Sequence, residues 1–221
     1  MAHLEEMPLF PLQAVLFPYS SLQLHVFEER YREMVRHCVE YDTPFGIVLI
    51  RSGSEVGDTP DPYLVGTAVR VQSVHTYQDG RMDLRVKGER RFRVRKLDDS
   101  RPYLVGFVEP VVELDVDENP RTNALVMRAR EVFRMLIEGS FSRSEVSVQV
   151  FFPPDPTALS FVIASFLQID DSTKQKLLET TDTADRLSEL IPLIERQIVE
   201  AKSPRFAKLD PTQLSDWISP N

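Results

Sequence analysis

The sequence predicts an α+β fold in which a strand-rich first half is followed by a helical second half. Apolar residues alternate in twos through the first half, short turn signals separate the alternating segments, and helical spacing replaces the alternation near Asp117. We therefore expect a β subdomain over residues 1–116 with one helix at 28–41, and a helical subdomain over 117–202. A proline-containing apolar tail occupies residues 203–221.

The first half contains at least five predicted strands joined by short turns, a pattern typical of a small barrel or sandwich. Alternation is clearest in Met82–Lys87 and again around Phe92. Gly88-Glu89-Arg90 between these two runs is expected to close a hairpin, and Asp79-Gly80 is a tight-turn signal. The remaining strands are predicted at 45–50, 67–77 and 103–112.

One helix interrupts the strands. Its apolar residues recur at i, i+3, i+4, i+7 and i+8, which places them on a single helical face directed at the core. Cys38 belongs to this face and is interpreted as a core residue rather than a reactive thiol. The face consists of Tyr31, Met34, Val35, Cys38 and Val39.

The second half contains four predicted helices. Two begin with a capping residue followed by proline, at Asn119-Pro120 and Asp155-Pro156. Gly139 is expected to end the first of these helices as a left-handed cap. A short helix is predicted near 172–179 and a longer one over 183–202, where Pro192 is expected to cause a kink or break.

Composition restricts the function classes. The 221 residues carry a net charge of −8, which argues against a general binder of nucleic acid or anionic membranes. A single cysteine excludes an intrachain disulfide framework and fits a reducing, cytoplasmic location. No run of about 18 apolar residues is present, so no membrane span is expected.

No catalytic motif emerges from the sequence. A phosphate-binding loop, a nucleophile elbow and a His-Glu-x-x-His zinc motif are all absent, so we assign no catalytic, cofactor-binding or metal-binding residue. His25-x-x-Glu28 provides too few ligands for a metal site. We interpret His25, Glu28, Arg30 and Tyr31 as a structural corner between a strand and the helix that follows it.

A basic segment raises the alternative of RNA binding. Residues 81–101 hold nine Lys and Arg against four Asp and Glu. Aromatic residues that would stack on bases are missing from this segment, so a solvated basic face is the favoured interpretation. The predicted basic stripe consists of Arg85, Lys87, Arg91, Arg93 and Arg95.

Several motifs in order closely resemble the amino-terminal domain of Lon proteases, over most of residues 7–200. The opening residues carry the clearest match, and further motifs continue into the helical half. They are Met7-Pro8-Leu9-Phe10-Pro11-Leu12, Leu16-Phe17-Pro18, His25-Val26-Phe27-Glu28-x-Arg30-Tyr31, Gly66-Thr67-Ala68, Asp79-Gly80-Arg81, Val86-x-Gly88-x-x-Arg91-Phe92, Pro102-Tyr103-Leu104-Val105, Asp155-Pro156, Leu159-Ser160, Lys174-Gln175-x-Leu177-Leu178-Glu179 and Arg186-Leu187.

The resemblance implies a small PUA-like β-barrel with one inserted helix, followed by an α-helical bundle. It further implies a non-catalytic module that binds unfolded polypeptide or a partner protein in substrate or adaptor recognition linked to protein quality control. The family's ATPase and Ser-Lys peptidase domains have no counterpart in these motifs, so we expect a free-standing member that is not an enzyme and needs no cofactor. Weak self-association fits the same family.

Candidate partner-binding residues come from three segments. Phe10 and Phe17 lie in the apolar opening, where core packing is the favoured alternative. Asp58 and Tyr63 lie in or beside the loop 51–62, which matches no family motif. Phe206 and Trp217 belong to the tail, which we expect to dock on its own chain or a neighbouring copy and to be displaceable.

Overall fold

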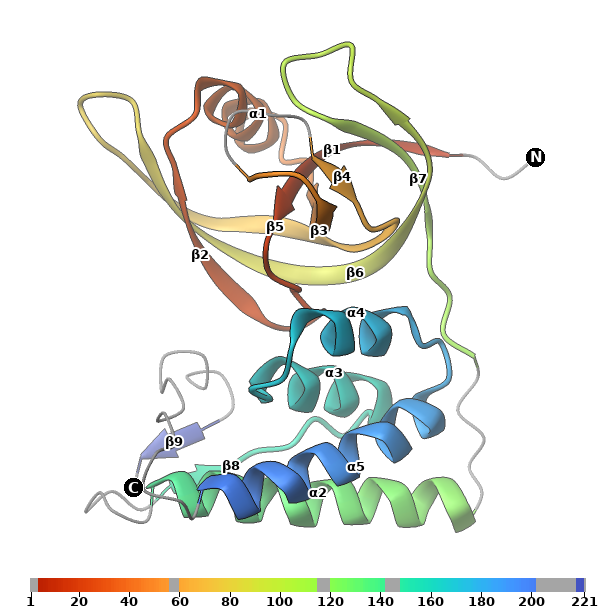
Figure 1. The fold of residues 1–221 in the computed structure, drawn as a ribbon. Helices are drawn as coiled ribbons and strands as arrows, with labels where there is room; N and C mark the ends of the chain where they lie inside the picture. The colour runs from red at the N-terminus through yellow and green to blue at the C-terminus, as the bar shows by residue number, and fades with distance from the viewer. Residues whose placement is uncertain (1–3, 56–59, 115–119, 142–147, 202–217, 221) are drawn as a thin grey trace. The chain divides into compact units, whose positions relative to one another are not determined.

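The chain divides into two compact units, which are described separately (Figure 1). Unit 1 comprises Met1–Val112 together with Asp171–Glu179, and unit 2 comprises Glu113–Asp170 together with Thr180–Asn221. The structure is a computed structural model that describes residues 4–55, 60–114, 120–141, 148–201 and 218–220.

Five strands of unit 1 form a closed ring of pairings. Each of β1, β7, β6, β5 and β3 pairs with the next, and β3 pairs in turn with β1. The β1–β3 pairing is parallel and the other four are antiparallel. The strands are β1 (Glu5–Leu12), β2 (Ser21–Val26), β3 (Phe45–Ser52), β4 (Asp61–Pro62), β5 (Val65–Thr76), β6 (Met82–Asp98) and β7 (Val105–Pro110).

Alternating side chains of these strands bury both faces of the sheet. Leu9 and Phe10 are neighbours on β1 but belong to two different clusters of buried residues. Helix α1 (Glu29–Glu40), the predicted helix of the first half, packs in the cluster of Phe10. That cluster includes Phe10, Tyr31, Met34, Val35, Cys38 and Phe45; the other includes Met7, Leu9, Val48, Phe92 and Val108.

The hairpin predicted at Gly88-Glu89-Arg90 is wrong, because β6 continues through these residues as one strand of 17 residues. Gly88 allows this path. A Cβ placed on Gly88 would lie 2.4 Å from the carbonyl oxygen of Phe17, so only glycine fits beside that oxygen. Glu89 forms a bulge in β6 rather than a turn. On β5, Ala68 pairs with Arg90 and the next residue, Val69, pairs with Gly88, so Glu89 has no partner in the register.

Helix α4 (Asp171–Glu179) groups with the strands, which corrects the predicted boundary that placed all of 117–202 in the helical subdomain. Two buried polar side chains fix this helix. Arg91 Nη1 donates to the carbonyl oxygen of Leu178 at 2.5 Å, and Gln175 Nε2 donates to the carbonyl oxygen of Val65 at 3.0 Å. The hydrophobic periodicity of the sequence could not indicate these two contacts. They join residues that are separated in the chain by 87 positions and by 110 positions, respectively.

Unit 2 contains helices α2 (Pro120–Phe141), α3 (Pro156–Phe166) and α5 (Thr183–Ala201). Asp155 caps α3 as predicted, accepting a hydrogen bond from the Ala158 amide at 2.7 Å. Arg186 organises the interior: its side chain is fully buried, donates to Ser160 Oγ at 2.8 Å and contacts Glu113 Oε2 at 3.0 Å. Desolvation lowers the pKa of Arg186, and the nearby Glu113 carboxylate partly offsets this effect.

The predicted end of the first helix of unit 2 is wrong, because α2 continues past Gly139 to Phe141 and Gly139 does not take a positive φ. Helix α5 is continuous through Pro192, so the proline does not break it, and the alternative of a kink stays a prediction. Pro192 and Ser188 are both exposed, so water can hydrogen-bond the Ser188 carbonyl that the proline leaves without its helical donor.

The end of the tail pairs with its own chain. Strand β9 (Ile218–Pro220) runs antiparallel to β8 (Val148–Val150) in unit 2. The tail residues Phe206 and Trp217 lie outside the described residues. Whether a partner displaces the tail stays a prediction.

We predict that Gly88→Ala destabilises the protein by about 1–3 kcal/mol, because the added methyl group forces the Phe17 carbonyl away from β6. Urea unfolding followed by circular dichroism measures the change. Gly139→Ala is the matched control. Apart from its chain neighbours and the surrounding helix backbone, no atom lies within 4 Å of the position of its Cβ, and alanine favours a helix by up to about 1 kcal/mol. Equal stability of Gly88→Ala and the parent would contradict the close-approach argument.

Candidate functional site

A groove in unit 1 lies at the corner where β2 ends and α1 begins. Its cavity volume is about 160 Å³. An apolar cavity of about this size holds one aromatic ring or one large aliphatic side chain. The residues lining this corner groove are Phe10, Leu12, Gln23, Leu24, His25, Val26, Phe27, Glu28, Tyr31 and Glu55.

The floor of the corner groove is rigid and apolar. The Phe10 and Tyr31 rings stack with centroids 4.2 Å apart, and both side chains are buried. Leu24 and Val26 point inward from β2 because alternate residues of a strand face the same side. Burial raises the pKa of the Tyr31 hydroxyl, so Tyr31 stays neutral at physiological pH.

An ion pair holds the start of α1 beside the groove. Arg30 Nε and Nη2 lie 3.1 and 3.0 Å from Glu28 Oε2, and the guanidinium carbon lies 4.6 Å from the centre of the Tyr31 ring. Glu28 is also the residue preceding the first turn of α1. Of the predicted corner residues, Glu28, Arg30 and Tyr31 are therefore brought together.

His25 bonds to a separate strand rather than to the other residues of the predicted corner. Its Nδ1 lies 2.6 Å from Asp83 Oδ1, and no bond to Glu28 is found among the described residues. Tyr77 donates to Asp83 Oδ2 at 2.5 Å, so Asp83 links β2 to the β5–β6 hairpin. The hydrogen bond from Tyr77, and after it the one from His25, lowers the pKa of Asp83. The Tyr77–Asp83 hydrogen bond also raises the pKa of Tyr77.

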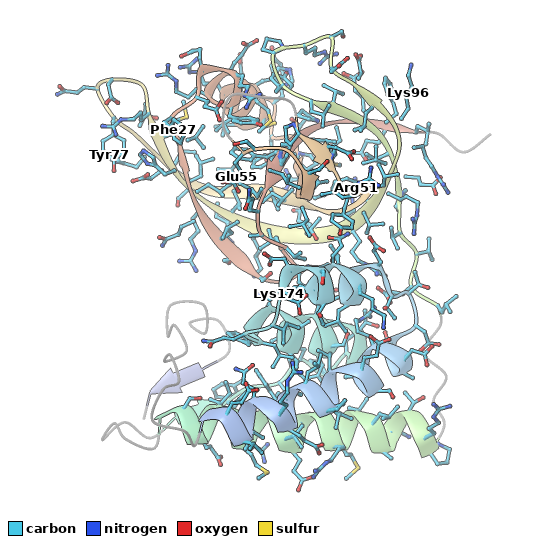
Figure 2. The ribbon with its side chains drawn as sticks, in the orientation of Figure 1. Phe27, Arg51, Glu55, Tyr77, Lys96 and Lys174 are labelled. Atoms are coloured by element: carbon cyan, nitrogen blue, oxygen red, sulfur yellow. The ribbon has the colours of Figure 1, made fainter. Side chains whose placement is uncertain are left out.

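Exposed side chains form the mouth of the groove. Phe27 is 49% exposed although it is a large aromatic residue, and its ring centre lies 6.2 Å from that of His25. Figure 2 shows Phe27 and Tyr77 beside the β5–β6 hairpin, with Glu55 nearer the middle of unit 1. Glu55 Oε1 accepts a hydrogen bond from the Gln13 amide, which holds this part of the loop at the groove.

Of the other predicted partner-binding residues, Phe17 and Tyr63 are not part of the corner groove. Phe17 is 1% exposed and belongs to the core, whereas Phe10 lines the groove as part of its floor. Tyr63 lines a second cavity of about 290 Å³ together with Gln13 and Arg51. Asp58, Phe206 and Trp217 lie outside the described residues.

The predicted basic stripe is not a continuous surface. Arg91 is buried and holds α4, which contradicts its predicted exposure. The bulge in β6 beside Gly88 changes which side chains of this strand face inward. The alternation of the sequence alone could not locate the bulge. Arg95 contacts Glu109 at 2.5 Å, Arg85 is exposed, and Lys87 and Arg93 are half-buried.

The described residues contain neither a metal-ligand cluster nor an exposed thiol. Within them, no three His, Cys, Asp or Glu side chains gather as a metal site would require. Cys38 is buried, and burial raises the pKa of its thiol, which disfavours the reactive thiolate. None of the described helices is both long and apolar enough to cross a membrane.

Sequence reasoning missed several residues of the corner groove. Leu24, Val26 and Glu55 line it together with the predicted residues, and Asp83 fixes His25 from a separate strand. The apolar alternation of Leu22, Leu24 and Val26 was a detectable signal for the strand. No local signal in the sequence could pair Asp83 with His25, 58 positions earlier.

Comparison with known protein families identifies the family to which this chain belongs. Residues 6–196 match the family described as the ATP-dependent protease La (LON) substrate-binding domain. The chain belongs to this family. The match covers both units, so the Lon-type resemblance seen in the motifs extends through the helical unit as well.

Relatives of this Lon substrate-binding domain are bacterial. It is 28% identical over 197 residues to Lon protease 2 of Myxococcus xanthus and 29% identical over 199 residues to Lon protease of Trichlorobacter lovleyi. The alignments cover 86% and 87% of this chain but only 24% of each relative. The chain therefore spans about a quarter of the length of these curated relatives.

Solved structures support the same fold. The crystal structure of a Lon N-terminal domain protein from Xanthomonas campestris matches with a TM-score of 0.62 and 30% identity, covering 85% of this chain and 98% of that one. The N-terminal domain of the Mycobacterium avium complex Lon protease matches with a TM-score of 0.64 at 18% identity, covering 86% of this chain and 98% of that one. The predicted α+β class is confirmed.

We predict that Asp83→Asn lowers the melting temperature at neutral pH and flattens its decline in acid. The pKa of Asp83 is lower in the folded protein than in the unfolded chain, so its stabilisation is present above the unfolded value of about 3.9. That stabilisation is lost as the pH falls through the folded-state pKa. The gap between variant and parent should therefore shrink below about pH 4.

Melting temperatures between pH 3 and pH 7 test this expectation. Glu33→Gln is the control, because Glu33 is an exposed carboxylate on α1. A constant gap between Asp83→Asn and the parent at every pH would show that the Asp83 charge does not stabilise this corner.

Proposed function

We propose that the protein is a non-catalytic recognition module that binds exposed apolar side chains of unfolded polypeptides. The observation that carries this proposal is the corner groove, an open cavity of about 160 Å³ with a rigid floor of Phe10 and Tyr31. A folded protein hides such side chains in its core, so a preformed apolar groove selects chains that expose them.

The family supports the same assignment. The matched description names a substrate-binding domain of an ATP-dependent protease, and the substrates of such a protease are polypeptides. We propose that this chain performs substrate or adaptor recognition in protein quality control. The closed ring of five strands with α1 packed on it supports a PUA-like barrel as the scaffold that positions the groove.

Phe27 provides a direct test of the groove. It lines the cavity but is 49% exposed, so removing its ring should cost little folding stability. Burying a large apolar side chain against it contributes about 1–1.5 kcal/mol, roughly half the value for full burial. We predict that Phe27→Ser weakens binding of a permanently unfolded protein about five- to tenfold.

Fluorescence anisotropy of a labelled, reduced and alkylated protein measures this affinity. Tyr41→Ser is the matched control, because Tyr41 is an aromatic residue of unit 1 that is 61% exposed and does not line the groove. Melting temperatures of both variants should stay near that of the parent. If the two variants bind equally well, the corner groove is not the polypeptide site.

A further inference from the structure

The outer edge of β2 has no strand paired with it in the described part of the chain. All six residues of β2 pair with β6 on the other edge without any register shift. A strand edge offers a row of backbone donors and acceptors that an extended polypeptide satisfies. The five consecutive residues from Gln23 to Phe27 line the corner groove, which places this edge at the cavity.

Unlike β5, β2 lacks the features that prevent another strand from pairing with its edge. The second half of β5 also has an open edge, because β3 pairs only with Thr67–Val69. A register shift between Val71 and Ser73 disrupts that half, and Arg70 on it contacts both Asp42 and Glu89. Bulges and charged residues are the usual devices that prevent strand addition. β2 has neither, since its sequence is Ser-Leu-Gln-Leu-His-Val.

The charges around the groove favour a basic partner. Glu55 and Glu28 are the two charged residues of the lining, and Asp83 lies beside His25 at its mouth. Arg30 compensates Glu28, and on β6 the exposed Arg85 lies opposite Gln23 as Asp83 lies opposite His25, which leaves Glu55 as the acidic residue of the lining without a compensating cation among these residues. Lys or Arg in an added segment would be attracted to this carboxylate, and salt would weaken the attraction.

We propose that the β2 edge binds an extended polypeptide segment as an additional strand, with a large apolar side chain in the corner groove and Lys or Arg next to it. The alternation of β2 supports this arrangement. Leu24 and Val26 face inward and His25 faces outward, so neighbouring residues of an added strand also face opposite sides. This proposal rests on the proposed function and specifies the conformation and charge of the ligand.

Backbone-methylated peptides separate strand addition from simple groove binding. The probe is a seven-residue peptide with a central Phe flanked by Lys, and two methylated forms carry N-methyl groups on alternate sets of residues. Amide groups of alternate residues point to opposite sides of a strand, so only one set faces β2. We expect one form to bind at least tenfold more weakly and the other within about twofold of the parent peptide.

Peptides with Lys, Gln or Glu beside the Phe test the charge preference. We expect affinity to fall in that order, and we expect Glu55→Gln to reduce the Lys-to-Glu affinity ratio at least threefold. Gln keeps an acceptor for the Gln13 amide, so this change removes charge with little effect on the loop. Glu40→Gln, an exposed carboxylate on α1 outside the groove lining, is the control and should leave the ratio unchanged.

The outcomes distinguish the two proposals. If both methylated forms bind like the parent peptide while Phe27→Ser weakens all three, the groove binds side chains and strand addition is wrong. If no peptide binds, the proposed function itself fails at this site. Self-association in sedimentation velocity that the Lys peptide reverses would assign the β2 edge to a second copy of this chain and overturn the chosen ligand.

Discussion

The close approach between Gly88 and the carbonyl oxygen of Phe17 determines how unit 1 is built. Because no Cβ occupies that space, the chain that enters β2 lies directly against β6, which runs as one strand of 17 residues. One edge of β6 then pairs with β2 near its start and with β7 near its end. The Gly88 amide donates to Ser20, and the Tyr19 amide donates to Gly88, so the chain entering β2 is held against the same point.

This arrangement gives β2 a particular position. It pairs with β6 but lies outside the closed ring of β1, β7, β6, β5 and β3, and so it keeps an unpaired edge in the described structure. The end of β1 and the start of α1 provide the apolar floor beside that edge. The corner groove therefore combines a cavity for one side chain with backbone groups for a strand, which are the two elements of extended-peptide recognition.

Polar contacts inside the units have mainly structural roles. Buried Arg91 holds α4, buried Arg186 joins three segments of unit 2, and the Glu28–Arg30 pair fixes the start of α1. A buried guanidinium is costly unless its donors find acceptors, and these contacts supply acceptors to each of the three side chains. The acidic groups Glu55 and Asp83 are partly exposed instead, where a charge costs folding less than in the core.

Local patterns in the sequence were sufficient for the α+β class, for α1, for the capped start of α3 and for the family, because propensity, capping and motif order are local properties. They also identified Phe10, Glu28, Arg30 and Tyr31, which lie together at the corner. The continuity of β6, the membership of α4 in unit 1, the burial of Arg91 and the His25–Asp83 bond depended on tertiary contacts between residues far apart in the chain. A bulge reverses the facing of a strand without changing the alternation of the sequence, and the missing Cβ of a glycine allows another part of the chain to approach closely. Only the folded structure could therefore decide these features.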